Sequence, residues 1–339
     1  MPIIAEFNDH FESGNWEKTL DLISYFLSAI RYELPEQRFF YSWIIKAECE
    51  RETGRLVRAE ESIHIAADEK SEDPIVLGAF GYLHMRRRDF SSTAELFTKA
   101  LACCGSSDKV IDRFYYIYPL LEIGGMPNRN DRKLILDADH SSWPQDSLLK
   151  LYNAQEILLY RGKEYRKGVD VFEDMRQQGL HDTMSVIYAH LCLKDLGEHA
   201  EAQVLLTSAI RESKTNLKLN VSNLYYQLAE FNLFLNEPRK AAAIYEKHLL
   251  DLEAKTRQCV VRYARILRKL GDEKRMRIEC SKMLNGTFPN PQTCEDFYYD
   301  GFAHFLLGNS ERAHYDYERS RRFGSHYSQL EEGEIPRTV

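Results

Sequence analysis

Residues 77–101 read LGAFGYLHMRRRDFSSTAELFTKAL and decide the fold class. Apolar and small residues recur every three or four positions on either side of Arg88 and Asp89, which is the spacing of one helix face. The stretch therefore predicts two short helices joined by a turn at Arg88 and Asp89. Large and small residues follow a fixed order along them: Leu77, Phe80, Gly81 and His84 before the turn, then Phe90, Thr93, Phe97 and Ala100 after it.

The same hairpin pattern recurs along the chain about every 34 to 40 residues. Aligned copies place the turn at Gly14, Gly54, Arg88, Gly125, Lys163, Gly197, Asn236, Gly271 and Gly308. Seven of these nine residues are glycine or asparagine, which end a helix at low cost because they tolerate a positive φ angle. The recurrence predicts a repeat array.

Each expected second helix carries a small residue at one aligned position, with a single exception. The residues there are Thr19, Ala59, Thr93, Asn130, Gly168, Ala202, Ala241, Met276 and Ala313. The matching position of the first helices is less regular: Phe7, Ala47, Gly81, Tyr118, Glu156, His190, Ala229, Ala264 and Gly301. The fourth copy also has Pro119 in its first helix and a polar Asn130-Asp131 pair in its second, so we expect it to be bent or shortened.

This order of large and small residues resembles the tetratricopeptide repeat (TPR), whose two helices keep a small residue where they cross. The resemblance implies an all-α solenoid, a right-handed superhelix of helix-turn-helix repeats, and a protein-binding function. We expect a single array over 1–323 and a flexible tail at 324–339. Its hairpins would be 1–34, 35–72, 73–106, 107–143, 144–180, 181–216, 217–253, 254–288 and 289–323. A pentatricopeptide or HEAT-like array is the alternative, because its period is similar.

Charge is unevenly distributed over the 339 residues, whose formal net charge is −7. Residues 1–75 contain 8 basic and 16 acidic side chains, whereas residues 255–283 contain 10 basic and 3 acidic ones. The acidic total argues against general nucleic-acid binding, which depends on lysine and arginine. A nucleic-acid adaptor using the basic hairpin 255–283 is kept as the less favoured alternative.

The sequence predicts a protein of the reducing cytoplasm. Its N-terminus lacks the basic start and apolar run of a secretory signal, and no apolar run reaches the ~18 residues that span a membrane. The seven cysteines are odd in number and lie mostly at apolar helix positions, as expected of buried thiols.

Motifs for catalysis or cofactor binding are absent from the sequence. The stretch Gly124-Gly125-Met126-Pro127 lacks the lysine of a phosphate-binding loop, and no Cys-x-x-Cys pair occurs. His181, His190 and His199 are nine residues apart, whereas helical metal pairs require three or four. We therefore expect no enzymatic activity, no cofactor and no metal.

In the TPR family the first helices line a groove that receives a peptide or a partner helix. The resemblance implies that the aligned first-helix residues, among them Glu48 and Tyr82, face this groove. The residues that we select for partner binding are Tyr115, Tyr188, Tyr226, Arg262, Arg265, Tyr298, Tyr299 and Phe302, because tyrosine and arginine dominate binding hot spots. Aromatic residues at helical spacing also form cores, so this alternative stays open for each of them.

We expect a scaffold, an adaptor or a client-binding chaperone that holds an extended or helical protein segment of acidic and aromatic or aliphatic character. The predicted principal contact is the C-terminal groove, where Arg262 and Arg265 would select acidic character. Tyr298, Tyr299 and Phe302 would supply the anchor surface. A regulator whose array changes curvature on binding a peptide is a second hypothesis.

Overall fold

The structure of the protein is a computed structural model that describes residues 10–11, 13–30, 36–104, 110–143, 145–250, 256–288, 290–291 and 294–322. These residues form helices joined by turns, with no strand among them. The expected tail at 324–339 and most of the first helix expected in hairpin 1–34 lie outside the described residues.

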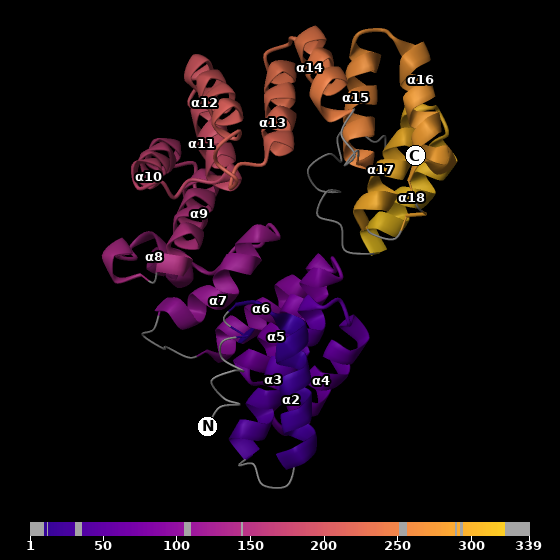
Figure 1. Ribbon diagram of the computed structural model, residues 1–339. Coiled ribbons are helices and arrows are strands. Elements are labelled where there is room, and N and C mark those ends of the chain that lie inside the picture. The colour runs from indigo at the N-terminus through magenta and orange to yellow at the C-terminus, as the bar shows by residue number, and fades with distance from the viewer. Residues whose placement is uncertain are drawn as a thin grey trace. The chain divides into compact units, whose positions relative to one another are not determined.

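Helices follow one another in short antiparallel pairs, and from residue 36 onward each predicted hairpin contains two of them (Figure 1). They are α2 (Trp16–Ile30), α3 (Glu36–Glu52), α4 (Leu56–Lys70), α5 (Pro74–Arg86), α6 (Phe90–Cys103), α7 (Val110–Glu122), α8 (Arg129–Leu136), α9 (Gln145–Arg161), α10 (Tyr165–Gln177), α11 (Thr183–Asp195), α12 (His199–Glu212), α13 (Val221–Phe234), α14 (Pro238–Ile244), α15 (Arg257–Lys269), α16 (Glu273–Lys282), α17 (Cys294–Leu306) and α18 (Ser310–Arg322). One 3₁₀ turn, η1 (His140–Ser142), precedes α9, and π-helical turns η2 (Tyr245–Leu249) and η3 (Met283–Thr287) extend α14 and α16.

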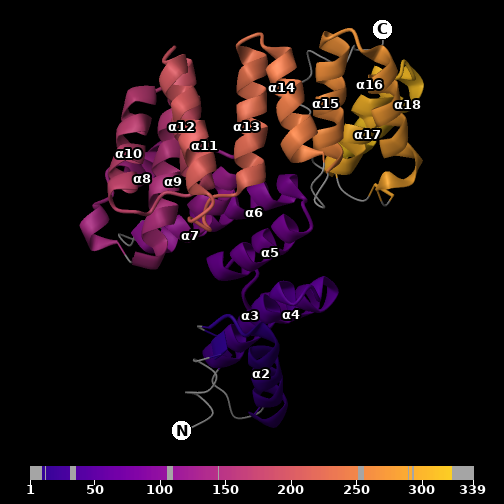
Figure 2. The ribbon, with the colours of Figure 1, turned by 45° about the horizontal axis from the view of Figure 1, so that its top comes forward.

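The chain divides into two compact units, residues 1–131 and 132–339, and the division falls inside α8. In the first unit the closest packing is within the pairs α3/α4 and α5/α6. In the second unit α11 to α16 lie side by side in chain order (Figure 2). Most helices pack on their chain neighbours, and several first helices also contact the next first helix, as α9 does α11. Among the described residues, no helix is both long and apolar enough to cross a membrane.

The turns between paired helices follow the sequence prediction closely. Eight of the nine predicted turn residues have a positive φ angle, including the non-glycine residues Arg88, Lys163 and Asn236 at 59–62°. In the fourth hairpin the positive angle belongs to Gly124 and not to Gly125. A Cβ on Gly125 would lie 2.4 Å from Leu120 Cδ1, so this residue is needed for close packing instead.

Small residues lie where the two helices of a hairpin cross, as predicted. A Cβ on Gly81 in α5 would come within 2.9 Å of the Phe97 ring in α6. A Cβ on Gly301 in α17 would meet the backbone of α18 at the Ala313 carbonyl oxygen, 3.1 Å away. Eight of the nine predicted small positions in second helices are buried, and only Asn130 is exposed.

The fourth hairpin is shortened, which confirms the prediction from its sequence. Its second helix, α8, has 8 residues, and Pro119 lies within its first helix, α7. Asn128 Oδ1 accepts hydrogen bonds from the backbone N–H groups of Asn130 and Asp131 and so starts α8. Arg113 of α7 donates to the buried Asp131 carboxylate at 2.8 Å. Polar pairing here replaces the small-residue crossing of the other hairpins.

Candidate functional site

The residues selected for partner binding all lie on first helices, but their exposure differs widely. Tyr115 in α7 is 61% exposed. Half-buried residues are Tyr188 in α11, Tyr226 in α13, and Arg262 and Arg265 in α15. Tyr298, Tyr299 and Phe302 in α17 are between 1% and 4% exposed.

Four side chains from three successive first helices form a connected patch in the first unit. This Tyr82–Tyr115 patch consists of Glu48 and Arg51 in α3, Tyr82 in α5 and Tyr115 in α7. Arg51 forms an ion pair with Glu48, and its guanidinium lies over the Tyr82 ring at 5.3 Å from the centroid. The rings of Tyr82 and Tyr115 are edge to face, 5.5 Å apart, and the Tyr82 hydroxyl donates to the Tyr115 carbonyl oxygen at 2.7 Å.

The surroundings of this patch favour a neutral Tyr115 hydroxyl and a charged Arg51 guanidinium. Although the Tyr115 side chain is largely exposed, partial desolvation by its neighbours raises the pKa of Tyr115, and the nearby Glu48 carboxylate raises it further. Burial lowers the pKa of the Arg51 guanidinium. The neighbouring Glu48 carboxylate has a larger effect in the opposite direction, so the pKa is raised overall. Within the described part of the chain, the Tyr115 hydroxyl has no hydrogen-bond partner. The patch therefore offers an aromatic ring and a neutral hydroxyl beside an arginine that is already paired with Glu48.

In the second unit, the half-buried residues that were selected for partner binding already contact neighbouring side chains. Tyr188 packs against the Tyr160 ring at a centroid distance of 5.8 Å. The Tyr226 hydroxyl accepts a hydrogen bond from Gln258 Nε2 at 3.3 Å, and Arg262 lies 3.7 Å from a Glu230 carboxylate oxygen. These contacts join α13 to α15. Tyr226 and Arg262 thus lie on two first helices that contact each other.

Tyr298, Tyr299 and Phe302 belong to the core and not to a groove surface. The rings of Tyr298 and Phe302 are stacked, with centroids 6.4 Å apart, in a cluster with Tyr245 and Tyr263. The spacing of positions 298, 299 and 302 defines the buried stripe of α17, and the same spacing had suggested the groove stripe. Because their side chains are covered, these residues do not supply the anchor surface that we expected.

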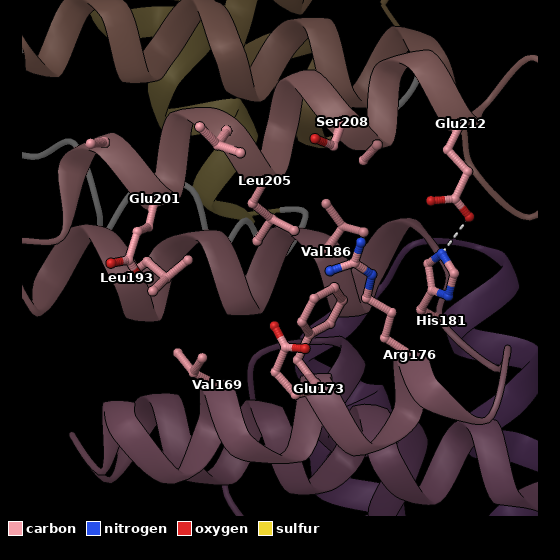
Figure 3. A pocket seen from close by; sticks show the side chains of 14 residues that line it. Val169, Glu173, Arg176, His181, Val186, Leu193, Glu201, Leu205, Ser208 and Glu212 are labelled. Atoms are coloured by element: carbon pink, nitrogen blue, oxygen red, sulfur yellow. Dashed lines mark hydrogen bonds and ion pairs between the residues drawn. The ribbon is translucent and has the colours of Figure 1, made fainter.

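A pocket of about 350 Å³, which the sequence analysis did not predict, opens between two second helices of the second unit (Figure 3). Its walls are α10 and α12, and both helices pack on α11, which forms the floor. Phe172, Val186 and Leu193 close its base and are buried. The α12 wall carries Ala200, Glu201, Val204, Leu205 and Ser208, and the α10 wall carries Val169, Glu173 and Arg176.

Helical spacing makes this pocket recognisable in retrospect. Residues 169, 172, 173 and 176 form one stripe of α10, and residues 200, 201, 204, 205 and 208 form one stripe of α12. Small residues, Ala200 and Ser208, occupy places on the α12 stripe where larger side chains would fill the space. We missed the signal because we searched only the first helices for binding residues.

The three regularly spaced histidines contact different groups. His181 Nε2 lies 2.6 Å from a Glu212 carboxylate oxygen, and His190 Nδ1 lies 3.2 Å from the Ala202 carbonyl oxygen. Burial lowers the pKa of His190 to about 4. His199 packs against the Phe234 ring. Across the described ranges, no three His, Cys, Asp or Glu side chains are placed to hold a metal ion.

Comparison with known proteins shows the fold. No family model and no curated protein matches the sequence. The apo form of RapI is 11% identical over 99% of both chains, with a TM-score of 0.53. Human IFIT1, as a dimer with m7Gppp-AAAA, is 14% identical over 93% of this chain and 80% of that chain, with a TM-score of 0.52.

A tetratricopeptide repeat protein from Parabacteroides merdae is 12% identical over 98% of this chain and 95% of that chain, with a TM-score of 0.37. The likeness to RapI and IFIT1, together with the hairpin geometry, identifies the fold as an all-α array of TPR-like helix-turn-helix repeats. At these identities the comparisons show the fold alone.

Proposed function

We propose that the protein is a non-enzymatic scaffold or adaptor that binds an extended or helical segment of another protein on its first-helix face. The observation that carries this proposal is the Tyr82–Tyr115 patch. It combines one largely exposed tyrosine with an arginine stacked on a second tyrosine, across three successive first helices. Tyrosine and arginine are the side chains that concentrate binding energy at protein interfaces.

The patch is fixed before any partner binds. The Tyr82 hydroxyl is held by the Tyr115 backbone, and Arg51 is held by Glu48 and Glu52. A partner segment therefore orders few additional side chains on this surface, which lowers the entropic cost of binding. Glu48 and Glu52 already neutralise Arg51, so the patch offers a partner aromatic surface and hydrogen-bonding groups and not a free positive charge.

Ion pairing within the repeats favours a protein partner over a nucleic acid. Arg257 binds Asp296 and Asp300, Arg262 lies close to Glu230, and Arg275 binds Glu246. These arginines belong to the basic hairpin 255–283, and carboxylates of neighbouring helices partly neutralise them. Phosphate binding requires lysine and arginine side chains that can exchange counterions for phosphates.

Peptide selection on the purified chain tests the proposal. Peptides from a random phage-displayed library are selected on the parent protein, and the affinity of the best synthetic peptide is measured by fluorescence polarisation. Loss of a hot-spot tyrosine costs about 2 kcal/mol, or roughly 30-fold in affinity. We expect Tyr115→Ala to cause such a loss at both low and high salt, because the lost contact is mainly apolar.

Tyr25→Ala is the matched control, because Tyr25 is 65% exposed on α2, a second helix. It should bind the peptide like the parent. Equal melting temperatures of parent and variants, measured by circular dichroism, establish that folding is unchanged. Parent-like affinity of folded Tyr115→Ala for every selected peptide would refute the patch as the site. Binding of a single-stranded RNA and no peptide would favour the nucleic-acid alternative.

A further inference from the structure

The pocket between α10 and α12 lies on second helices and is separate from the first-helix patch. Its base is apolar core, formed by Phe172, Val186 and Leu193. Its rim is apolar as well, since Val204 is 62% exposed and Leu205 is half-buried. The volume of about 350 Å³ lies within the range of about 300–1,000 Å³ that is usual for ligand sites. The space accepts whole side chains of a partner.

Carboxylates on the two walls of the pocket restrict what can enter. Glu173 on α10 and Glu201 on α12 stand on opposite walls, with Leu193 and Leu205 close by (Figure 3). Both glutamates are exposed, and neither forms an ion pair with any residue that the structure describes. The nearest lining cation is Arg176, one turn further along α10.

At the opposite end of the pocket, the Glu212 carboxylate already has hydrogen-bond partners. His181 Nε2 and Asn216 Nδ2 both contact Glu212 Oε1, at 2.6 and 3.2 Å. Burial acts against the charge of Glu212, but these hydrogen bonds outweigh it and hold its pKa below the usual value. Positive charge is therefore more favourable beside Glu201 and Glu173, which have no ion-pair partner among the described residues, than beside Glu212.

We propose that the pocket between α10 and α12, called the α10/α12 groove from here on, is a second docking site. It binds a partner polypeptide through a lysine or arginine side chain flanked by an aliphatic residue. The aliphatic stem of the basic side chain would pack on Leu193 and Val169, and its head would reach Glu173 and Glu201. The neighbouring aliphatic side chain would occupy the space beside Leu205 and Ser208. This basic and aliphatic partner chemistry differs from the aromatic contact that Tyr115 offers on the first-helix patch.

Two variants of the protein test separately whether peptide binding depends on the space in the groove and on its negative charge. Ser208→Trp fills the groove, and Glu173→Gln combined with Glu201→Gln removes the charge while keeping the shape. Asp170→Asn combined with Asp137→Asn is the matched control, because it makes the same charge change at exposed positions outside the groove. Phage-displayed random peptides are selected on the full-length parent and then sorted by whether Ser208→Trp still binds them.

We expect the groove-dependent peptides to share a lysine or arginine next to a leucine, isoleucine, valine or methionine. A synthetic peptide of this kind should bind the double glutamine variant about tenfold or more weakly than the parent at about 0.1 M salt, and should bind the control like the parent. The difference should shrink at about 1 M salt, where exposed charges are screened.

Three results would overturn the proposal. The first is that every selected peptide still binds Ser208→Trp. The others are that the peptides lost on Ser208→Trp lack a basic residue, or that the double glutamine variant binds those peptides like the parent. Tyr115→Ala distinguishes the two surfaces in the same experiment. Peptides that need Tyr115 and tolerate Ser208→Trp support the first-helix patch alone and count against the groove.

Discussion

A buried glutamate is the most unusual single residue of this repeat array. Glu156 in α9 occupies the crossing position that alanine or glycine takes in five other first helices. It is 0% exposed, and neither carboxyl oxygen has a hydrogen-bond partner among the described residues. Burial raises the pKa of Glu156 well above its usual value, and the nearby Asp182 raises it further. The fold thus favours the neutral acid.

This raised pKa makes the stability of the protein depend on pH. The unfolded chain loses the Glu156 proton near pH 4.5, whereas the folded chain keeps it to higher pH. Between these two values the folded state binds more protons, so the free energy of unfolding falls as pH rises. Glu156→Gln removes this effect. We expect the melting temperature of the variant, relative to the parent, to increase from about pH 5 to about pH 8, measured by thermal circular dichroism.

Glu173→Gln, an exposed change on α10, serves as the control and should show the same difference from the parent at both pH values. A Glu156→Gln difference that does not change with pH would contradict the prediction. Sequence alone could not reveal this site, because charged residues on helices are rarely fully buried. The sequence only marked Glu156 as an irregular crossing residue.

At the scale of the helix and its turn, local backbone geometry explains why the sequence prediction succeeded. Gly197 follows α11 with φ at 80°, and Lys163 follows α9 with φ at 62°. A Cβ on Gly197 would have no neighbour within 4 Å, so only backbone strain opposes a side chain there. The left-handed conformation costs an L-residue roughly 1–2 kcal/mol.

We therefore expect Gly197→Ala to lower the free energy of unfolding by about 1 kcal/mol. Lys163→Gly should raise it by a smaller amount, because the greater freedom of glycine in the unfolded chain offsets part of the gain. Urea denaturation followed by circular dichroism measures both changes. If both substitutions shift stability in the same direction, the turn geometry is not what limits stability at these positions.

Turn residues and crossing residues could be predicted because each depends on a few neighbours in sequence. The exposed binding residues of the candidate site were harder to predict from the sequence. The exposure of Tyr115 and the burial of Tyr298 depend on which side of a first helix meets the next hairpin, and both residues follow the same helical spacing. The pocket between α10 and α12 depends on three helices at once. No periodicity within one helix distinguishes a covered stripe from an open one.

At the scale of the whole molecule, repeats that touch only their neighbours should transmit a local change over a short distance. Arg257 shows how one such neighbour interface is built. It is 8% exposed in α15, and it donates to Asp300 Oδ1 at 2.9 Å and to Asp296 Oδ1 at 3.0 Å, both in α17. Burial raises the pKa of Asp300, and the attraction of Arg257 opposes this shift. One side chain therefore joins the last two hairpins of the second unit.

Removal of Arg257 should loosen these hairpins and leave the first unit unchanged. Arg257→Ala leaves two acidic side chains without their cation, one of them buried, and breaking a buried pair in this way typically costs about 3–5 kcal/mol. We expect faster amide hydrogen exchange in α15 to α18, and unchanged exchange in α2 to α6, because nearest-neighbour contacts carry the effect. Lys269→Ala, at an exposed position of the same helix, should change little. Equal acceleration of exchange in both units would mean that the array unfolds as one cooperative body, and that its repeats are coupled over a longer range than their contacts.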